Sequence, residues 1–355
     1  MEFGISLSLA RIPLPRAMPL SSLAERCGFR TVSVGEAAHD SFAAATAMAT
    51  STHTPRIMTG VTTWVRPPIL TATAAVTVDE ISGGRFTLGL GTMPDHWNRD
   101  HYGIDPSKPL ERMREYLEVI RRTLGAPAGS TVDFEGARFS VRGYRRAAPP
   151  LRADIPIVLA ATRPGMARLA GEIADGVYFN VIHTVGDLRD SLVPAVEQGE
   201  QRRSVAAKRV ERILMLRCSI DDDADLAWER LRESLRMYLG VPYLADVARS
   251  AGFDVEPAMA LARDGRVDDA VRAIPMELVQ QMGIAGTARA CRDQLARYRE
   301  VVDTVVFAPP SGLGADAGVE QITRILEADW HDGRPPEPRD ELPVRDHLPQ
   351  DDHAA

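Results

Sequence analysis

Eight short apolar runs divide this chain, and each leads into a longer segment that is amphipathic or rich in alanine. The runs cover residues 3–9, 31–34, 57–61, 86–90, 155–160, 176–179, 212–219 and 304–308. Strands that alternate with helices are connected as parallel βαβ units, and eight such units close into a barrel rather than an open sheet. The sequence therefore predicts an α/β fold, a (β/α)8 TIM barrel.

The segment DEISGGRFTLGLG, residues 79–91, shows one such junction without a linker. A helix over residues 71–81 ends at Ser82, Gly83 and Gly84, because glycine accepts the positive φ that stops a helix. Residues 86–90 then form a buried strand. The glycines of GLG do not indicate a dinucleotide-binding loop, because a third glycine and an immediate helix are missing.

The length of 355 residues suits one elaborated barrel better than two domains. We expect a single domain over residues 1–330, with insertions near residues 92–108, 132–141 and 241–275. The first insertion reads as a long loop after the fourth strand, and the second as a small external hairpin. Residues 331–355 are rich in Pro, Asp, Glu and Arg, so we expect a disordered or loosely attached tail.

Charge and cysteine content exclude several classes of function. The net charge of −7 gives no basic surface for a nucleic-acid backbone. No apolar run is long enough to span a membrane, and no secretory signal is recognisable, so a cytoplasmic protein is expected. Cys27, Cys218 and Cys291 are widely spaced in apolar or helical contexts, which favours free thiols over a disulfide or a metal site.

Polar side chains gather where the predicted strands end. In such barrels the chemistry takes place at the carboxyl ends of the strands. Any one of these residues could simply cap a helix, but their convergence on one rim predicts a small-molecule site. They are Glu36, His39, Thr62, Thr63, Thr92, His96, Thr162 and Asn180.

The turn after the fifth strand offers a second feature of this rim. A proline at the first helical position, Pro164, is typical of a helix start. The backbone amides of Gly165 and Met166, helped by Arg163, suit a phosphate group. An ordinary helix start with a solvated arginine explains the same residues equally well.

Four segments in this order carry a resemblance to a known family: GVTTWVRPP, DEISGGRFTLGLG, AATRPGMARLAGEIADGV and GIAGTARACRDQLARY. The chain resembles the bacterial luciferase-like superfamily, and within it the deazaflavin-dependent oxidoreductases similar to methylenetetrahydromethanopterin reductase. The resemblance covers nearly all of residues 1–330. It is specific for the fold and much less specific for the substrate.

The resemblance implies a luciferase-like barrel that binds coenzyme F420, a deazaflavin, or alternatively FMN, across its carboxyl face. A bulge at Gly60 and Val61, often with a cis peptide bond, would support the ring, and the turn at residues 162–166 would hold the phosphate. Arg66 and Arg289 could meet an acidic tail of the cofactor. The implied cofactor-binding residues are Gly60, Val61, Thr62, Thr63, Gly91, Thr162, Arg163, Pro164, Gly165, Met166 and Asn180.

The chain departs from the family at the end of the second strand. Relatives commonly carry an acidic residue followed by a histidine, whereas Glu36 is followed here by Ala37, and His39 is displaced by two residues. The candidate groups for proton transfer are therefore Glu36, His39 and His96, with His101 as a further possibility, since imidazole suits this role near neutral pH.

The loop after the fourth strand is the best candidate for substrate contacts, because loops on a rigid barrel vary without disturbing its core. The predicted substrate-binding residues are Trp64, Met93, Trp97 and Tyr102.

The function we expect is hydride transfer between reduced deazaflavin and an activated C=C, C=N or C=O bond of a small organic substrate, or the reverse reaction. The alternative is an FMN-dependent monooxygenase that uses reduced flavin and O2. A third possibility is a non-catalytic flavin-binding protein. A homodimer is possible, although no interface can be read from the sequence.

Overall fold

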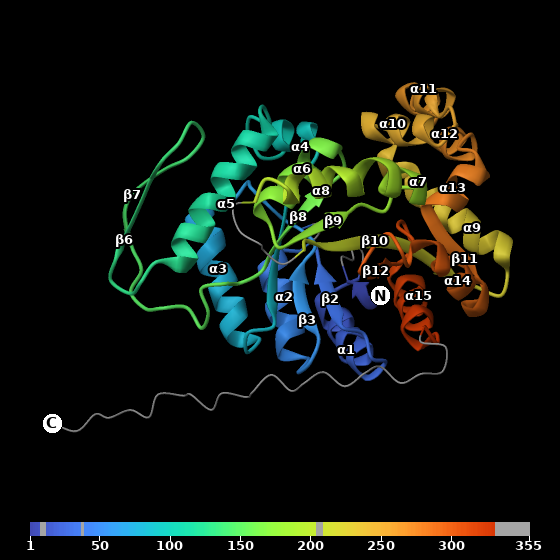
Figure 1. Ribbon diagram of the computed structural model, residues 1–355. Helices are drawn as coiled ribbons and strands as arrows, with labels where there is room; N and C mark the ends of the chain where they lie inside the picture. Colours follow the sequence, from blue (N-terminus) through green and yellow to red (C-terminus); the bar gives the residue numbers. More distant parts are fainter. Residues whose placement is uncertain (8–11, 37–38, 204–208, 331–355) are drawn as a thin grey trace.

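The computed structural model describes residues 1–7, 12–36, 39–203 and 209–330, and it shows a closed barrel of eight parallel strands (Figure 1). The predicted α/β barrel is therefore confirmed. The last of these strands pairs with the first, and the order around the barrel is β1 (Glu2–Ser6), β2 (Thr31–Val34), β3 (Arg56–Thr59), β5 (Phe86–Gly91), β8 (Ile157–Ala161), β9 (Gly176–Phe179), β10 (Glu211–Ile220) and β12 (Thr304–Ala308).

All eight predicted runs contain a strand, but the third ends earlier than expected. β3 stops at Thr59, and the chain then bulges before a two-residue strand, β4 (Thr62–Thr63), pairs with the end of β5. Of the predicted first strand, residues 8 and 9 lie outside the described residues. The predicted tail, residues 331–355, also lies outside them.

Helices cover the outside of the barrel. Proline at the first turn begins several of them, where its missing N–H costs nothing, and Asp40 caps α2 by accepting from the amides of Phe42 and Ala43. The covering helices are α1 (Leu14–Arg26), α2 (Ser41–Thr50), α3 (Pro68–Ile81), α5 (Pro109–Gly125), α6 (Pro164–Ile173), α8 (Val193–Glu200), α14 (Ala288–Leu295) and α15 (Ala315–Glu327).

Side chains alternate across the barrel wall, because successive residues of a strand point to opposite faces. On β10, Leu214 and Leu216 pack outward into the main core between strands and helices. Ile213 and Met215 point inward and join Met58 and Tyr178 in a separate cluster that fills the barrel.

An ion pair closes the amino end of the barrel. The Arg56 guanidinium donates two hydrogen bonds to Glu211, with Nη1 to Oε2 at 2.6 Å and Nη2 to Oε1 at 3.0 Å. The hydroxyl of Thr304 donates to the same carboxylate at 2.7 Å, and Arg56 Nε donates to Thr31. Burial acts to lower the pKa of Arg56, but the Glu211 carboxylate outweighs it and the pKa is raised.

The predicted loop after the fourth strand contains a helix, α4 (Asp95–Asp100), so the expectation of a plain loop is wrong there. Six residues are too few to show helical periodicity, and only Pro94 marks the start. Residues 131–145 form an antiparallel hairpin of β6 (Thr131–Glu135) and β7 (Ser140–Arg145), which projects beside α3 and α5 (Figure 1).

A group of short helices lies beyond the carboxyl end of β10, on the opposite side of the molecule from the hairpin (Figure 1). It includes α9 (Ala224–Glu233), a 3-10 turn at Ser234–Tyr238, α10 (Pro242–Ser250), α11 (Glu256–Arg263), α12 (Val267–Arg272) and α13 (Met276–Met282). These elements share their own buried core, which also takes in Val181 and Ile182 after β9. We call this group the helical cap.

An unpredicted strand, β11 (Gly283–Gly286), joins the cap to the barrel. β10 is long enough to pair with β9 and β12 along its first half and with β11 along its second half, from Arg217 to Ile220. Among the described residues, no helix is long and apolar enough to cross a membrane. Cys27, Cys218 and Cys291 are free thiols.

Candidate active site at the carboxyl end of the barrel

The bulge between β3 and β4 forms a ledge at the mouth of the barrel. The peptide bond between Gly60 and Val61 is cis. The ledge rests on glycine: a Cβ at Gly91 would lie 2.5 Å from Val61 Cγ2, and one at Gly89 would lie 1.8 Å from the Thr59 carbonyl oxygen. Only glycine at these two positions of β5 lets the bulge lie so close, and Val61 stays half-buried at the mouth.

Glu36 is tied to this ledge. Its Oε2 accepts hydrogen bonds from the hydroxyls of Thr62, at 2.7 Å, and Ser41, at 3.1 Å, and its backbone N–H donates to the Val61 carbonyl. Arg66 lies 3.6 Å from Oε1 and also pairs with Asp40. The structure therefore brings the predicted acidic residue and the predicted bulge together.

The loop after β5 is fastened to the ledge through Asn98, a residue that the sequence did not single out. Its Oδ1 accepts from the indole N–H of Trp64 at 2.8 Å, while its Nδ2 donates to the carbonyls of Thr92, at 2.8 Å, and Pro94, at 3.1 Å. Trp64 is only 2% exposed, so it holds the loop in place from behind.

Four rings line up on and after α4. His96 is exposed and packs edge-on against Trp97, with ring centroids 6.2 Å apart, and the ring of His101 lies 5.6 Å from that of Trp97. Tyr102 follows and is 43% exposed. Trp97 is half-buried, and so is Met93, which precedes the row in a left-handed conformation. His39 is half-buried just before α2.

The predicted phosphate site lies at the start of α6. Thr162 and Gly165 are half-buried, Pro164 is exposed and Met166 is buried. The Arg163 side chain is 59% exposed and pairs with Asp246 of α10 at 3.2 Å, so it joins the barrel to the helical cap. Arg289 is exposed on α14.

Two buried polar atoms at the mouth have no hydrogen-bond partner among the described residues. They are Thr63 Oγ1, on β4, and Asn180 Oδ1, directly after β9. Buried polar groups are normally hydrogen-bonded, so such atoms are suited to a polar ligand. A flat apolar ledge with unpartnered oxygens beside it fits a planar heterocycle that carries hydrogen-bonding edges.

Sequence reasoning missed a buried histidine in the loop after β9. His183 Nδ1 lies 2.5 Å from Asp187 Oδ2, while Nε2 is buried and has no partner among the residues that the structure describes. His183 precedes the short helix α7 (Val185–Asp187) and its N-cap Thr184, so helical spacing does not mark this pair in the sequence.

Arg217 was also missed. It lies on β10 two residues beyond Met215 and therefore points into the barrel, at its carboxyl end. In the sequence it resembles any polar residue of a strand.

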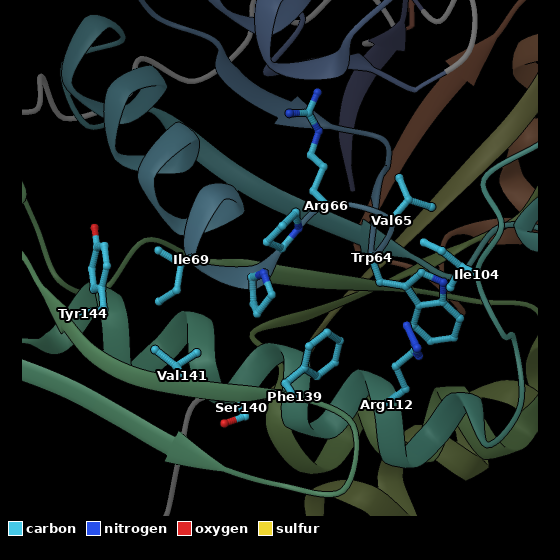
Figure 2. Close-up of a pocket in the computed structure, with 12 residues that line it drawn as sticks. Trp64, Val65, Arg66, Ile69, Ile104, Arg112, Phe139, Ser140, Val141 and Tyr144 are labelled. Atoms are coloured by element: carbon cyan, nitrogen blue, oxygen red, sulfur yellow. The ribbon is translucent and has the colours of Figure 1, made fainter.

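A separate pocket of about 500 Å³ lies beside the mouth, between the start of α3, α5 and the hairpin. The Arg112 guanidinium is placed over the rings of Trp64, at 5.6 Å, and Phe139, at 5.4 Å. Figure 2 shows Trp64 and Phe139 on either side of Arg112, and Arg66 pointing away from them. Trp64 thus belongs both to this pocket and to the support of the loop.

Comparison with known proteins agrees with the geometry. A family model described as luciferase-like monooxygenase matches residues 1–304. A Mycobacterium tuberculosis protein whose name assigns it to the coenzyme F420-dependent oxidoreductases is 32% identical over 323 residues, covering 83% of this chain and 92% of that protein. The 5,10-methylenetetrahydromethanopterin reductase of Archaeoglobus fulgidus is 33% identical over 232 residues, covering 64% and 63%.

The same relationship appears among solved structures. The coenzyme F420-dependent tetrahydromethanopterin reductase of Methanopyrus kandleri superposes with a TM-score of 0.79 at 25% identity, and the match covers 92% of this chain and 97% of that one.

Proposed function

This chain belongs to the luciferase-like monooxygenase family, and we propose that within it the chain is a coenzyme F420-dependent oxidoreductase. It would transfer a hydride between the deazaflavin and an activated C=C, C=N or C=O bond of a small organic substrate. The observation that carries the proposal is the glycine-backed ledge beside Glu36, in a chain that resembles the M. tuberculosis and Methanopyrus kandleri proteins whose names include F420.

The residues at the mouth fit this cofactor. We assign ring contacts to Gly60 and Val61 on the ledge. We assign polar contacts to Thr62, Thr63 and Asn180, the last two of which carry unpartnered buried oxygens. Gly91 keeps the ledge in place, and the start of α6, from Thr162 through Arg163, Pro164 and Gly165 to Met166, supplies amides for a phosphate. When bound, the cofactor supplies a hydride equivalent, two electrons and one proton, in a single step.

The chain's own task is to deliver or accept the accompanying proton. The carboxylate of Glu36 accepts a hydrogen bond from Thr62, directly after the ledge. We propose that Glu36 acts in this proton transfer together with His39, which lies just before α2. His96 sits on the exposed row of rings, where Met93, Trp97 and Tyr102 would meet the substrate and Trp64 would support them. A side chain near the reacting atom gives up the proton from its own O–H or N–H bond, or takes it up there, and no covalent bond forms between enzyme and substrate.

An anaerobic fluorescence titration with oxidised and reduced F420 and with FMN tests the proposal. We expect F420 to bind at least ten times more tightly than FMN. Gly91→Ala places a methyl group against Val61 and should weaken F420 binding at least tenfold. Gly125→Ala is the matched control, because a Cβ there meets nothing within 4 Å and F420 binding should not change.

Two other results would change the assignment. Tight preference for FMN, followed by oxygen uptake with reduced flavin, would establish the monooxygenase instead. Tight F420 binding without turnover of any unsaturated, imine or carbonyl substrate, in a protein whose cellular role survives loss of Glu36 and His39, would favour a flavin-binding protein without catalysis.

We also propose a cytoplasmic homodimer. Leu70 and Ile81 on α3 are 51% and 44% exposed, and such apolar side chains on one helix suit a contact between two copies. Light scattering behind size-exclusion chromatography should give twice the monomer mass. A monomer at micromolar concentration would contradict this part of the proposal.

A further inference from the structure

Arg217 has an environment that an arginine seldom occupies. Its Nη1 donates to the Pro309 carbonyl, while Nε is buried and has no hydrogen-bond partner among the described residues. The titratable side chains that face it are Tyr178 and Tyr238, whose hydroxyls are neutral, and no carboxylate is among its interactions in the described part of the chain. Burial lowers the pKa of Arg217 and raises those of both tyrosines.

The order of the strands places this arginine directly across the barrel from the ledge. Starting from β3, which leads into the ledge, β10 is the fourth strand in either direction around the closed sheet. The Tyr178 ring spans part of the distance: a Cβ at Gly60 would lie 3.3 Å from its Cε1, and Arg217 lies close enough to act on the pKa of its hydroxyl.

Arg217 lies at the mouth end of the barrel interior. Below it, toward the amino end, the interior is filled by Met215, Ile213 and Tyr178. These side chains fill the interior below the half-buried Arg217, which leaves the mouth as the side from which a ligand would approach. The hydroxyl of Tyr238, from the helical cap, accepts a hydrogen bond from the same guanidinium.

A partly buried guanidinium without a carboxylate partner is unfavourable for the free protein. Such an arrangement is retained when a ligand supplies the missing charge, since polar groups at functional sites are often paired only in the complex. Guanidinium groups bind carboxylates with strong, charge-assisted hydrogen bonds.

We propose that Arg217 is the anion-recognition residue of this site and that the substrate is a carboxylate, held by Arg217 on the side of the mouth that faces the ledge. This inference rests on the proposed function for the identity of the site. It adds the substrate class: a small unsaturated or carbonyl compound that carries a carboxylate near the bond to be reduced.

Binding of crotonate and of its neutral isostere crotonamide tests this directly. The full-length protein is titrated with each by calorimetry, once without cofactor and once with oxidised F420. We expect crotonate to bind at least tenfold more tightly than crotonamide, as a charge-assisted pair predicts. Arg217→Gln should abolish this preference, and Arg217→Lys should keep part of it. Arg212→Gln, on the outward face of the same strand, should keep all of it.

Several results would overturn the proposal. These are equal binding of crotonate and crotonamide by the wild type, no measurable binding of either up to 50 mM, or a preference that survives Arg217→Gln. A tenfold loss of F420 affinity in Arg217→Gln, with crotonate binding unchanged, would assign the anion to the cofactor instead. The titration without cofactor remains decisive even if the chain binds no F420, in which case only the proposed function fails.

A thermal melt separates recognition from a structural role. If Arg217 awaits a ligand, Arg217→Gln should melt at or above the temperature of the wild type without ligand, and crotonate should stabilise the wild type only. A melting temperature lowered by more than about 5 °C would show that the arginine holds the barrel together, and the proposal would be wrong.

Discussion

The two ends of the barrel treat an inward-pointing arginine in opposite ways. At the amino end Arg56 is matched by Glu211 with two hydrogen bonds, and Thr31 and Thr304 complete the cluster. At the carboxyl end Arg217 has a carbonyl and two tyrosines around it and no carboxylate among its described partners. An inward-pointing arginine thus has a carboxylate partner at the amino end, whereas the one at the carboxyl end has none and could still bind an anion.

This contrast follows from what each end has to do. At a closed end, each buried charge must be paired with another group of the protein, because no ligand reaches it. An end that receives a ligand must leave some polar atoms without partners, and Thr63 Oγ1, Asn180 Oδ1 and Arg217 Nε are such atoms among the described residues. In barrels of this class, stability resides at the amino end and chemistry at the carboxyl end.

The largest effect should come from breaking the paired end. Glu211→Gln leaves the Arg56 charge buried without a partner, and we expect a loss of about 3 kcal/mol or more in the free energy of unfolding by urea. F420 affinity of the folded protein should not change. Glu197→Gln removes the 51% exposed partner of Arg212 and should cost less than about 1 kcal/mol. Equal losses in the two variants would remove the distinction between the ends.

At the mouth, Asn98→Ala should have the next largest effect. It leaves the indole N–H of the buried Trp64 and the carbonyls of the loop without their partners, at a cost of about 2 kcal/mol. Because the loop would then be free to move, substrate affinity should fall as well. Arg99→Ala, on the exposed face of the same helix, is the control, and an Asn98→Ala variant with the same melting temperature would show that the fastening is unimportant.

Glu25, in the last turn of α1, offers a smaller test through its hydrogen bonds to the loop that enters β3. Burial acts to raise its pKa, but the hydroxyl of Thr54 and the amides of His53 and Thr54 donate to the carboxylate and hold the pKa below 4.5. A lowered pKa means that this stabilisation is present above pH 4.5 and is lost as the pH falls through the lowered value. Glu25→Gln should cost about 1 kcal/mol at pH 7.

Unfolding measured between pH 3 and pH 7 checks the sign. The difference between wild type and Glu25→Gln should shrink toward acid pH. A difference that stays constant over this range would show that the charge of Glu25 contributes nothing.

His96 should have the smallest effect on stability and a clear effect on function. It is exposed on α4 and its ring packs edge-on against that of Trp97, so His96→Ala should change the melting temperature by less than about 1 °C. Turnover or substrate affinity should change measurably, although the melting temperature does not. Unchanged turnover with a lowered melting temperature would mean that the row of rings serves packing alone.

The sequence predicts the barrel well because each of its eight strands is a short apolar run next to a helix signal. β11 was not predicted, because its sequence GIAG, at Gly283–Gly286, contains two glycines and an alanine and lacks the residues typical of a strand. It forms only because the second half of β10 offers a partner, and pairing between distant segments cannot be read from local composition.

The site was predictable where backbone chemistry marks it. The bulge at Gly60 and Val61 and the acidic Glu36 stood in recognisable segments, and the structure brings them together. Asn98 and Arg217 could not be found in this way, because their importance depends on which partners they gain or lack after folding. A polar residue in a loop and an arginine in a strand are individually unremarkable in a sequence.

The double pairing of β10 has a consequence for how such proteins can be altered. Arg217 stands opposite both Ala308 of β12 and Gly283 of β11, at the point where the strand passes from the barrel to the cap. The segment from Asp221 to Met282 therefore leaves the end of β10 after Ile220 and returns to it beside Arg217. A graft that exchanges this segment for that of a relative would replace the roof over the arginine and keep the arginine itself, so that new substrate shapes could be explored around an unchanged anchor.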